Sequence, residues 1–156
     1  MSEFNIRPIE PEDIATIAQW VTNIPLWQRY GLQFQTTSAQ LHNSLMRGDL
    51  ILTADVAEQP ACGLAWCLPD GGFGRSPYLK LLGVGGGIQG KGLGAALLDM
   101  TEQFASRHGR DIFLLVSDFN IDAQRFYQRQ GYAQVGALAG YVLPDVTELI
   151  FRKTLR

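Results

Sequence analysis

The spacing of hydrophobic residues in the first third of the chain predicts a strand followed by two helices. Phe4 and Ile6 alternate with polar neighbours, which is typical of a short strand. Residues 23–35 contain aromatic side chains without a clear period, which predicts a loop. Thr37 or Ser38 is placed to cap a second helix. The first helix is predicted after Pro11 because apolar residues then recur at helical spacing: Ile14, Ile17, Ala18 and Val21.

The rest of the chain alternates strand and helix patterns. Residues 50–56 and 61–68 predict an antiparallel hairpin, and residues 69–77 a glycine-rich loop. Further strands are predicted over residues 78–84, 111–117, 132–138 and 147–153, and helices over 93–108 and after Asn120. No repeat or linker interrupts this order. The pattern therefore predicts one α+β domain over residues 1–156, built on a mixed sheet.

Composition and charge exclude several classes of protein. With 156 residues, of which 46% are hydrophobic and 18% charged, the chain can bury an ordinary core and is not disordered. Its apolar runs are too short to span a membrane. A formal charge of -2 without a dense basic cluster disfavours nucleic acid as a partner. The polar N-terminus lacks a secretory pattern, which predicts a cytoplasmic protein, and Cys62 and Cys67 are predicted to be thiols of the core.

The chemistry concentrates in a glycine-rich segment. Seven of the twelve residues from Gly83 to Gly94 are glycine, and they lie between a predicted strand and an amphipathic helix. Exposed amides at the N-terminus of a helix bind phosphate through hydrogen bonds and the helix dipole. The segment therefore predicts a phosphate-binding loop.

Two nucleotide-binding motifs also fit part of this segment. Residues 85–91 match G-x-x-x-x-G-K, but Gly92 follows where a nucleotide triphosphatase needs Ser or Thr. Residues 85–90 match the dinucleotide motif G-x-G-x-x-G, and Asp118 follows the next strand, where a ribose ligand would lie. A nucleotide-dependent oxidoreductase is therefore an alternative, although its glycine motif usually opens the fold.

A third interpretation joins the loop to a later motif. Residues 89–94 read Gln-Gly-Lys-Gly-Leu-Gly, and residues 117–132 contain Asn120, Ala123, Phe126-Tyr127 and Gly131-Tyr132 in fixed order. At these positions the sequence resembles the GCN5-related N-acetyltransferase (GNAT) family. The pair of motifs is more specific than the glycines alone, while residues 85–87 depart from the family pattern.

The resemblance implies a mixed, mostly antiparallel sheet of about six to seven strands flanked by about four helices. It places acetyl-coenzyme A between the fourth and fifth strands, with the pyrophosphate on residues 89–94. No metal is expected. The cofactor-binding residues implied in this way are Leu82, Gly83, Val84, Gln89, Gly90, Lys91, Gly92, Leu93, Gly94, Ala95, Asn120, Ala123 and Tyr127.

The resemblance also implies catalytic roles. Tyr127 is expected to protonate the departing coenzyme sulfur, and the Val84 N–H to polarise the acetyl carbonyl. Asp118 and Asp70 are both candidates for the general base, which is left unassigned. The aromatic residues Trp27 and Tyr30 are expected to line the acceptor pocket.

The implied activity is acetyl transfer to a primary amine of a small molecule or peptide by direct attack. A non-catalytic module that binds coenzyme A is the alternative from a different class, because no base is evident. The family often dimerises, so a homodimer is one expected assembly.

Overall fold

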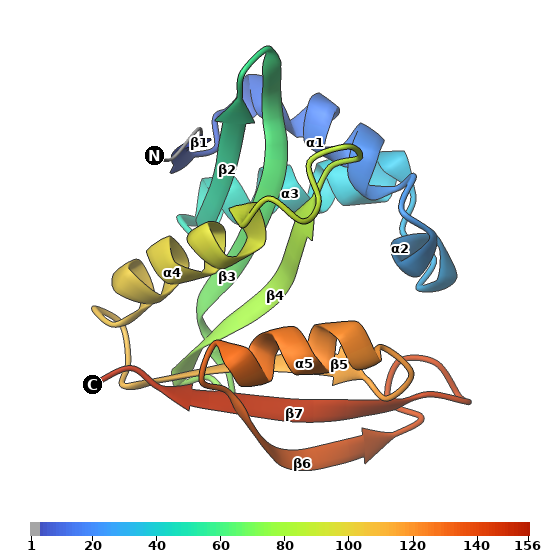
Figure 1. Ribbon diagram of the computed structural model, residues 1–156, viewed down its shortest axis with the longest axis vertical. Helices are drawn as coiled ribbons and strands as arrows, with labels where there is room; N and C mark the ends of the chain where they lie inside the picture. Colours follow the sequence, from blue (N-terminus) through green and yellow to red (C-terminus); the bar gives the residue numbers. More distant parts are fainter. Residues whose placement is uncertain (1–3) are drawn as a thin grey trace. The chain divides into compact units, whose positions relative to one another are not determined.

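A computed structural model describes residues 4–156 and contains a seven-stranded sheet with the order β1-β2-β3-β4-β5-β7-β6 (Figure 1). Strands β4 and β5 run parallel, whereas β1–β2, β2–β3, β5–β7 and β6–β7 pair antiparallel. Five α-helices accompany the sheet within the described residues. The predicted α+β class with a mixed, mostly antiparallel sheet is therefore confirmed.

The chain divides into two compact units, and strands β3 and β4 contribute to both. The first unit runs to Cys67 and includes Leu81–Thr101. Its helix α1 packs against α3, and its core includes the fully buried Ile17, Leu41 and Leu97. Its elements are β1 (Phe4–Pro8), α1 (Ile14–Val21), α2 (Pro25–Arg29), α3 (Phe34–Arg47), β2 (Leu50–Val56), and parts of β3 (Gln59–Gly72), β4 (Ser76–Val84) and α4 (Leu93–Ala105).

Two predictions for the aromatic segment were wrong. Residues 25–29 form α2 instead of a loop, because Pro25 occupies the first turn, where its missing N–H costs no hydrogen bond. Helix α3 begins at Phe34, so Thr37 and Ser38 lie inside the helix and do not cap it. The Thr37 N–H donates to the Gln33 carbonyl at 2.9 Å, which extends the helix toward its N-terminus.

The second unit comprises Leu68–Lys80 and Glu102–Arg156. It contains β5 (Asp111–Ser117), as predicted, together with α5 (Ile121–Arg129), β6 (Ala133–Ala139) and β7 (Thr147–Thr154). A glycine-rich loop was predicted over residues 69–77, but the observed loop is shorter. Strand β3 continues to Gly72 and β4 starts at Ser76. The short turn is closed by a 3.1 Å hydrogen bond from Arg75 N–H to the Gly72 carbonyl.

Cys62 and Cys67 are both buried and free, which confirms that they are core thiols. Among the residues that the structure describes, no helix is long and apolar enough to cross a membrane.

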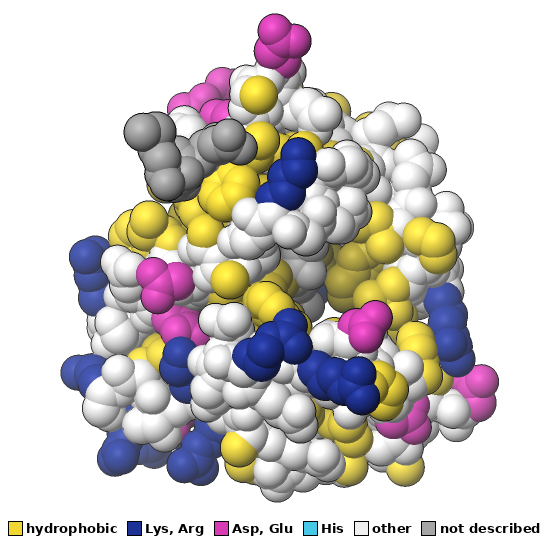
Figure 2. Space-filling model, in the orientation of Figure 1, with side chains coloured by type: hydrophobic (Ala, Val, Ile, Leu, Met, Phe, Trp, Pro, Cys, Tyr) yellow, Lys and Arg dark blue, Asp and Glu magenta, His cyan; other side chains and the backbone are white. Residues whose placement is uncertain are grey.

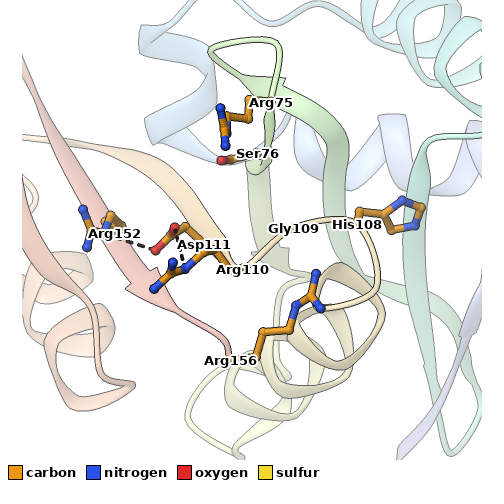
Figure 3. Close-up of a pocket in the computed structure, with 8 residues that line it drawn as sticks. All are labelled: Arg75, Ser76, His108, Gly109, Arg110, Asp111, Arg152 and Arg156. Atoms are coloured by element: carbon orange, nitrogen blue, oxygen red, sulfur yellow. Dashed lines mark ion pairs between the residues drawn. The ribbon is translucent and has the colours of Figure 1, made fainter.

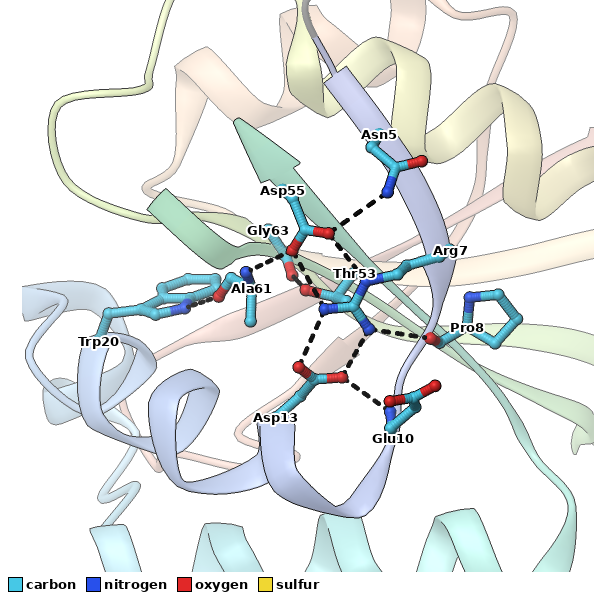
Figure 4. Close-up of polar contacts among 10 residues, drawn as sticks. All are labelled: Asn5, Arg7, Pro8, Glu10, Asp13, Trp20, Thr53, Asp55, Ala61 and Gly63. Atoms are coloured by element: carbon cyan, nitrogen blue, oxygen red, sulfur yellow. Dashed lines mark hydrogen bonds and ion pairs between the residues drawn. The ribbon is translucent and has the colours of Figure 1, made fainter. Parts of the chain in front are cut away.

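The first unit is tied together by a cluster of polar side chains around Arg7 (Figure 4). The Arg7 guanidinium contacts Asp13 at 2.7 Å and Asp55 at 2.9 Å, so it joins β1 to the turn before α1 and to β2. The Ala61 N–H also donates to the Asp55 carboxylate, at 3.0 Å. The hydrogen bond from Arg7 to Asp55 is the main reason why the pKa of Asp55 falls from 3.8 to about 2, and the hydrogen bond from Arg7 to Asp13 lowers the pKa of Asp13.

The Arg7 cluster makes the stability depend on pH. Because the pKa of folded Asp55 lies below its ordinary value, the carboxylate stabilises the fold above about pH 4 and loses this effect as the pH falls toward 2. Replacement of Arg7 by Met leaves Asp13, which is 8% exposed, without its cation. We expect Arg7→Met to lower the free energy of unfolding at pH 7 by about 2 kcal/mol, and by clearly less at pH 3.

Urea unfolding at both pH values measures this difference. Arg47→Met is the matched control, because Arg47 is 60% exposed and pairs with one carboxylate, Asp49, which also accepts a hydrogen bond from Ser44 Oγ at 2.6 Å. Such pairs contribute at most about 1 kcal/mol. Equal losses in the two variants would contradict the role given to the Arg7 cluster.

Candidate active site

The predicted acetyl-binding strand is the end of β4. The Gly85 N–H donates to the Cys62 carbonyl on β3 at 2.7 Å, so Gly85 faces β3. Backbone N–H groups of successive residues in an extended strand point to opposite sides. The Val84 N–H is therefore directed away from β3, as a donor to a bound carbonyl has to be.

Trp20 of α1 supports this strand end. Its indole N–H donates to the Ala61 carbonyl at 2.8 Å, next to Cys62 (Figure 4). A Cβ atom on Gly85 would lie 3.2 Å from the Cys62 oxygen and 3.5 Å from the Trp20 ring, and one on Gly83 would lie 3.4 Å from that ring. A side chain at Gly85 would therefore crowd the Cys62 carbonyl, and the indole lies at van der Waals distance beside both glycines.

Gln89 organises the loop that follows. Its side-chain oxygen accepts a hydrogen bond from the Gly87 N–H at 3.0 Å, and its side-chain amide donates to the Val84 carbonyl at 3.2 Å. Ile88 is only 5% exposed and anchors the loop in the core. The Gln89 side chain thus holds the backbone of the loop, a role that the sequence motif did not indicate.

The start of α4 presents free backbone donors. No described residue accepts a hydrogen bond from the N–H groups of residues 90–95, and the first helical bond there runs from Ala96 N–H to the Gly92 carbonyl at 3.1 Å. Gly90 and Gly92 have φ values of +79° and +83°, which only glycine adopts without strain. Lys91 is exposed in the same segment. Unpaired N–H groups, the helix dipole and a lysine together favour a bound phosphate.

In the second unit, Asn120 caps α5 as predicted. Its side-chain oxygen accepts a hydrogen bond from the Ala123 N–H at 3.1 Å. Gln124 adds two hydrogen bonds, to the carbonyls of Ser117 at 3.1 Å and Asp118 at 3.0 Å. These contacts fix the start of α5 to the end of β5.

Tyr127 lies on α5 with its ring between two other aromatic rings. Phe126 and Tyr132 contact it edge to face, at centroid distances of 5.1 and 5.6 Å. Its hydroxyl has no hydrogen-bond partner among residues 4–156, so it is available to donate a proton. Desolvation raises the pKa of the Tyr127 phenol above its ordinary value of 10.0, and the group therefore stays protonated at neutral pH.

A polar cluster that the sequence did not reveal holds Tyr132 in place. The Tyr132 hydroxyl donates to Glu102 at 2.8 Å, and the Lys153 ammonium donates to the other oxygen of Glu102 at 2.7 Å. The Tyr132 N–H also donates to the Tyr127 carbonyl at 2.9 Å. Because Glu102 precedes Tyr132 by thirty residues and Lys153 by fifty-one, no local pattern connects them.

The structure distinguishes the candidate bases by burial. Asp70 and Asp118 are exposed, and Asp118 accepts a hydrogen bond from the Thr147 N–H at 3.3 Å. Glu148 of β7 is only 4% exposed. Burial of the Tyr78 phenol, together with the negative charge of Glu148, raises the pKa of Tyr78 to about 12. The signal in the sequence was an acidic residue, Glu148, inside the strand predicted over residues 147–153, and it was missed in the sequence analysis.

The structure groups the predicted site residues by unit. Residues 82–95 lie together in the first unit, and Trp27 and Tyr30 belong to that unit as well. The rings of Trp27 and Tyr30 are 6.3 Å apart and partly exposed, Trp27 in α2 and Tyr30 at its C-terminal end. Asn120, Ala123 and Tyr127 lie together in the second unit.

Free N–H groups at the start of a helix, beside a strand end and a glycine-rich loop, are suited to hold a phosphorylated ligand. A family model described as the acetyltransferase (GNAT) family matches residues 17–132. The chain belongs to this family, which confirms the predicted family and the predicted class of enzyme, an N-acetyltransferase.

Solved structures show the same fold. YncA from Salmonella typhimurium, determined with acetyl-CoA, is 19% identical over 99% of this chain and 95% of its own, with a TM-score of 0.81. A ribosomal-protein-alanine N-acetyltransferase from Brucella melitensis is 20% identical over 96% and 99% of the two chains, with a TM-score of 0.80. An aminoglycoside 6'-N-acetyltransferase complexed with coenzyme A is 16% identical over 97% of each chain, with a TM-score of 0.79.

Proposed function

We propose that this protein transfers the acetyl group of acetyl-CoA to a primary amine of a small molecule or peptide. The observation that carries the proposal is the set of unpaired N–H groups at residues 90–95, at the start of α4. Family membership supports it, as do the acetyl-CoA and coenzyme A bound to the similar structures.

The loop is proposed to bind the diphosphate of the coenzyme. The N–H groups of residues 90–95 would donate to the phosphate oxygens, and Lys91 would add a charge. The Gln89 side chain would fix the shape of the loop for this ligand, because it forms hydrogen bonds with the Gly87 N–H and the Val84 carbonyl. Asn120 and Ala123 remain proposed cofactor contacts.

The proposed reaction is a direct attack. The neutral amine forms a C–N bond with the acetyl carbon, the Val84 N–H stabilises the negative carbonyl oxygen, and the C–S bond then breaks. The leaving sulfur takes the Tyr127 proton, and a base accepts the proton released by the amine. Glu148 is our candidate for this base, since it is the buried carboxylate of the second unit's described residues.

The acceptor is defined only by its chemical class. We propose that Trp27 and Tyr30 contact it, because their partly exposed rings offer apolar surface and a face for a cationic amine. The similar structures include enzymes named for a ribosomal protein and for an aminoglycoside, so both peptide and small-molecule amines need to be screened.

Titration calorimetry with acetyl-CoA tests the proposal. We expect saturable binding by the protein and at least tenfold weaker binding by Gly92→Val, because the new side chain would occupy the open space beside the free N–H groups. Gly48→Val is the matched control: Gly48 has a φ of +84°, against +83° for Gly92, and a Cβ atom at either position meets nothing within 4 Å.

Both substitutions introduce the same backbone strain, so melting temperatures should fall alike while only Gly92→Val loses the ligand. The absence of binding at millimolar acetyl-CoA would overturn the proposal. Binding without acetylation of any amine in a screen of peptides, polyamines and aminoglycosides would favour the non-catalytic module instead.

A further inference from the structure

A basic hollow lies in the second unit (Figure 3). It has a volume of about 860 Å³. Lys and Arg side chains gather on this part of the surface, near the C-terminal end of the chain (Figure 2). The charged side chains that line it are Arg75, Arg110, Asp111, Arg152 and Arg156, and the His108 side chain lies beside them.

Three segments distant in sequence converge to build the hollow. Parallel pairing of Tyr78 with Phe113 brings the start of β4 beside the start of β5. Gly109 then packs so closely on Pro77 that a Cβ atom would lie 2.7 Å from the proline ring. The antiparallel pairing of Phe113 with Arg152 adds the end of β7. Pairing in the sheet therefore brings the three segments together: Arg152 lies in β7, while Arg75 and Arg110 lie in the turns that lead into β4 and β5.

The charges in the hollow are not balanced. Asp111 has the one carboxylate side chain among the lining residues, against four guanidinium groups. It is shared by Arg152 at 3.3 Å, Arg110 at 4.0 Å and the Thr154 hydroxyl at 2.9 Å. Within the described chain, Arg75 and Arg156 have no acidic partner. A concave surface lined by one sign of charge concentrates counter-ions.

The chemistry favours phosphate groups. The planar guanidinium fork matches two oxygens of one phosphate, and several forks around one hollow match a chain of phosphates. The volume falls in the range of sites for small ligands, about 300 to 1,000 Å³. We propose that this hollow binds a small anion with several phosphate groups.

Within the second unit, this site is separate from the residues proposed for acetyl transfer. The hollow lies at the start of β5, at Asp111, whereas Asn120 and Tyr127 follow its end at Ser117. A strand of this length extends over about 20 Å. Loss of the anion is therefore expected to leave acetyl transfer unaffected.

Calorimetry with inorganic tripolyphosphate tests the proposal on the full chain. Saturating coenzyme A is added first, so that residues 89–94 do not bind the probe. We expect one saturable site, with binding at least tenfold weaker in Arg75→Gln/Arg156→Gln. The matched control is Arg125→Gln/Arg129→Gln, which removes the same charge from α5 and is expected to bind within about twofold of the unchanged protein. Thermal melts establish that both double variants fold.

Equal binding by the two double variants, or no binding at all, would overturn the proposal. Adenosine triphosphate, measured in parallel, separates two sources of the phosphates: equal affinity means that only the phosphate chain is recognised, and higher affinity means that a nucleoside is bound as well. Both of these results support a phosphate site. If the chain fails to bind coenzyme A, the comparison of the double variants still decides the question.

Discussion

Replacement of Tyr127 by Phe is expected to lower kcat by about 100-fold, the lower range of general acid catalysis, and to change the KM for acetyl-CoA less than about threefold. The substitution keeps the ring between Phe126 and Tyr132 and removes only the hydroxyl, which has no partner in the described chain. Steady-state kinetics with a peptide or polyamine acceptor measures both constants. Undiminished turnover would remove Tyr127 from the mechanism.

Tyr132→Phe is the matched control, because it removes a hydroxyl from the neighbouring ring. That hydroxyl donates to Glu102 at 2.8 Å, so we expect a loss of about 1 to 3 kcal/mol in stability and turnover within about threefold. A fall in kcat as large as that of Tyr127→Phe would show that the aromatic packing matters more than the phenol proton.

The pH dependence gives a second test of Tyr127. Because desolvation raises its pKa above the ordinary 10.0, the phenol should remain a proton donor throughout the neutral and mildly alkaline range. We expect kcat to show no decline from ionisation of Tyr127 below about pH 10. A decline near pH 8 that disappears in Tyr127→Phe would contradict the effect of burial.

Trp20→Ala is expected to lower kcat/KM for acetyl-CoA by about 10- to 100-fold, because small displacements of a reacting geometry have effects of this size. Trp20 is expected to act through the backbone of β4. It packs against Gly83 and Gly85 and donates to the Ala61 carbonyl at 2.8 Å, so it positions the strand end that carries the Val84 N–H.

Two conservative variants separate positioning from stability. Trp20→Phe removes the indole donor but keeps a ring, and we expect it to fold and to retain part of the activity. Trp66→Phe removes an equivalent hydrogen bond, from the indole to Ser44 Oγ at 2.8 Å, in the fully buried core of the same unit. We expect Trp66→Phe to lower the melting temperature with kcat/KM little changed. Parallel losses of activity in both variants would mean that Trp20 acts only through stability.

Local patterns in the sequence predicted most of the elements. The strand over residues 111–117, the cap at Asn120 and the glycine-rich loop before α4 depend on neighbours a few positions away, and such interactions are visible in a single sequence. The predictions of secondary structure were wrong where contacts with residues outside the segment determined its conformation. Residues 69–72 extend β3 despite Pro69 and two glycines, because pairing in the sheet outweighs their local preference for a loop.

The sequence by itself determined the family and the residues of the loop, because both motifs are short and their spacing is fixed by local geometry. Only the tertiary structure showed that the Gln89 side chain forms hydrogen bonds with the backbone of its own loop, and that Trp20 packs beside Gly83 and Gly85. It also showed that Glu102 joins Tyr132 to Lys153. It alone brought four arginines from three distant segments around one hollow. These arrangements depend on strand register and packing, which join residues that are far apart along the chain.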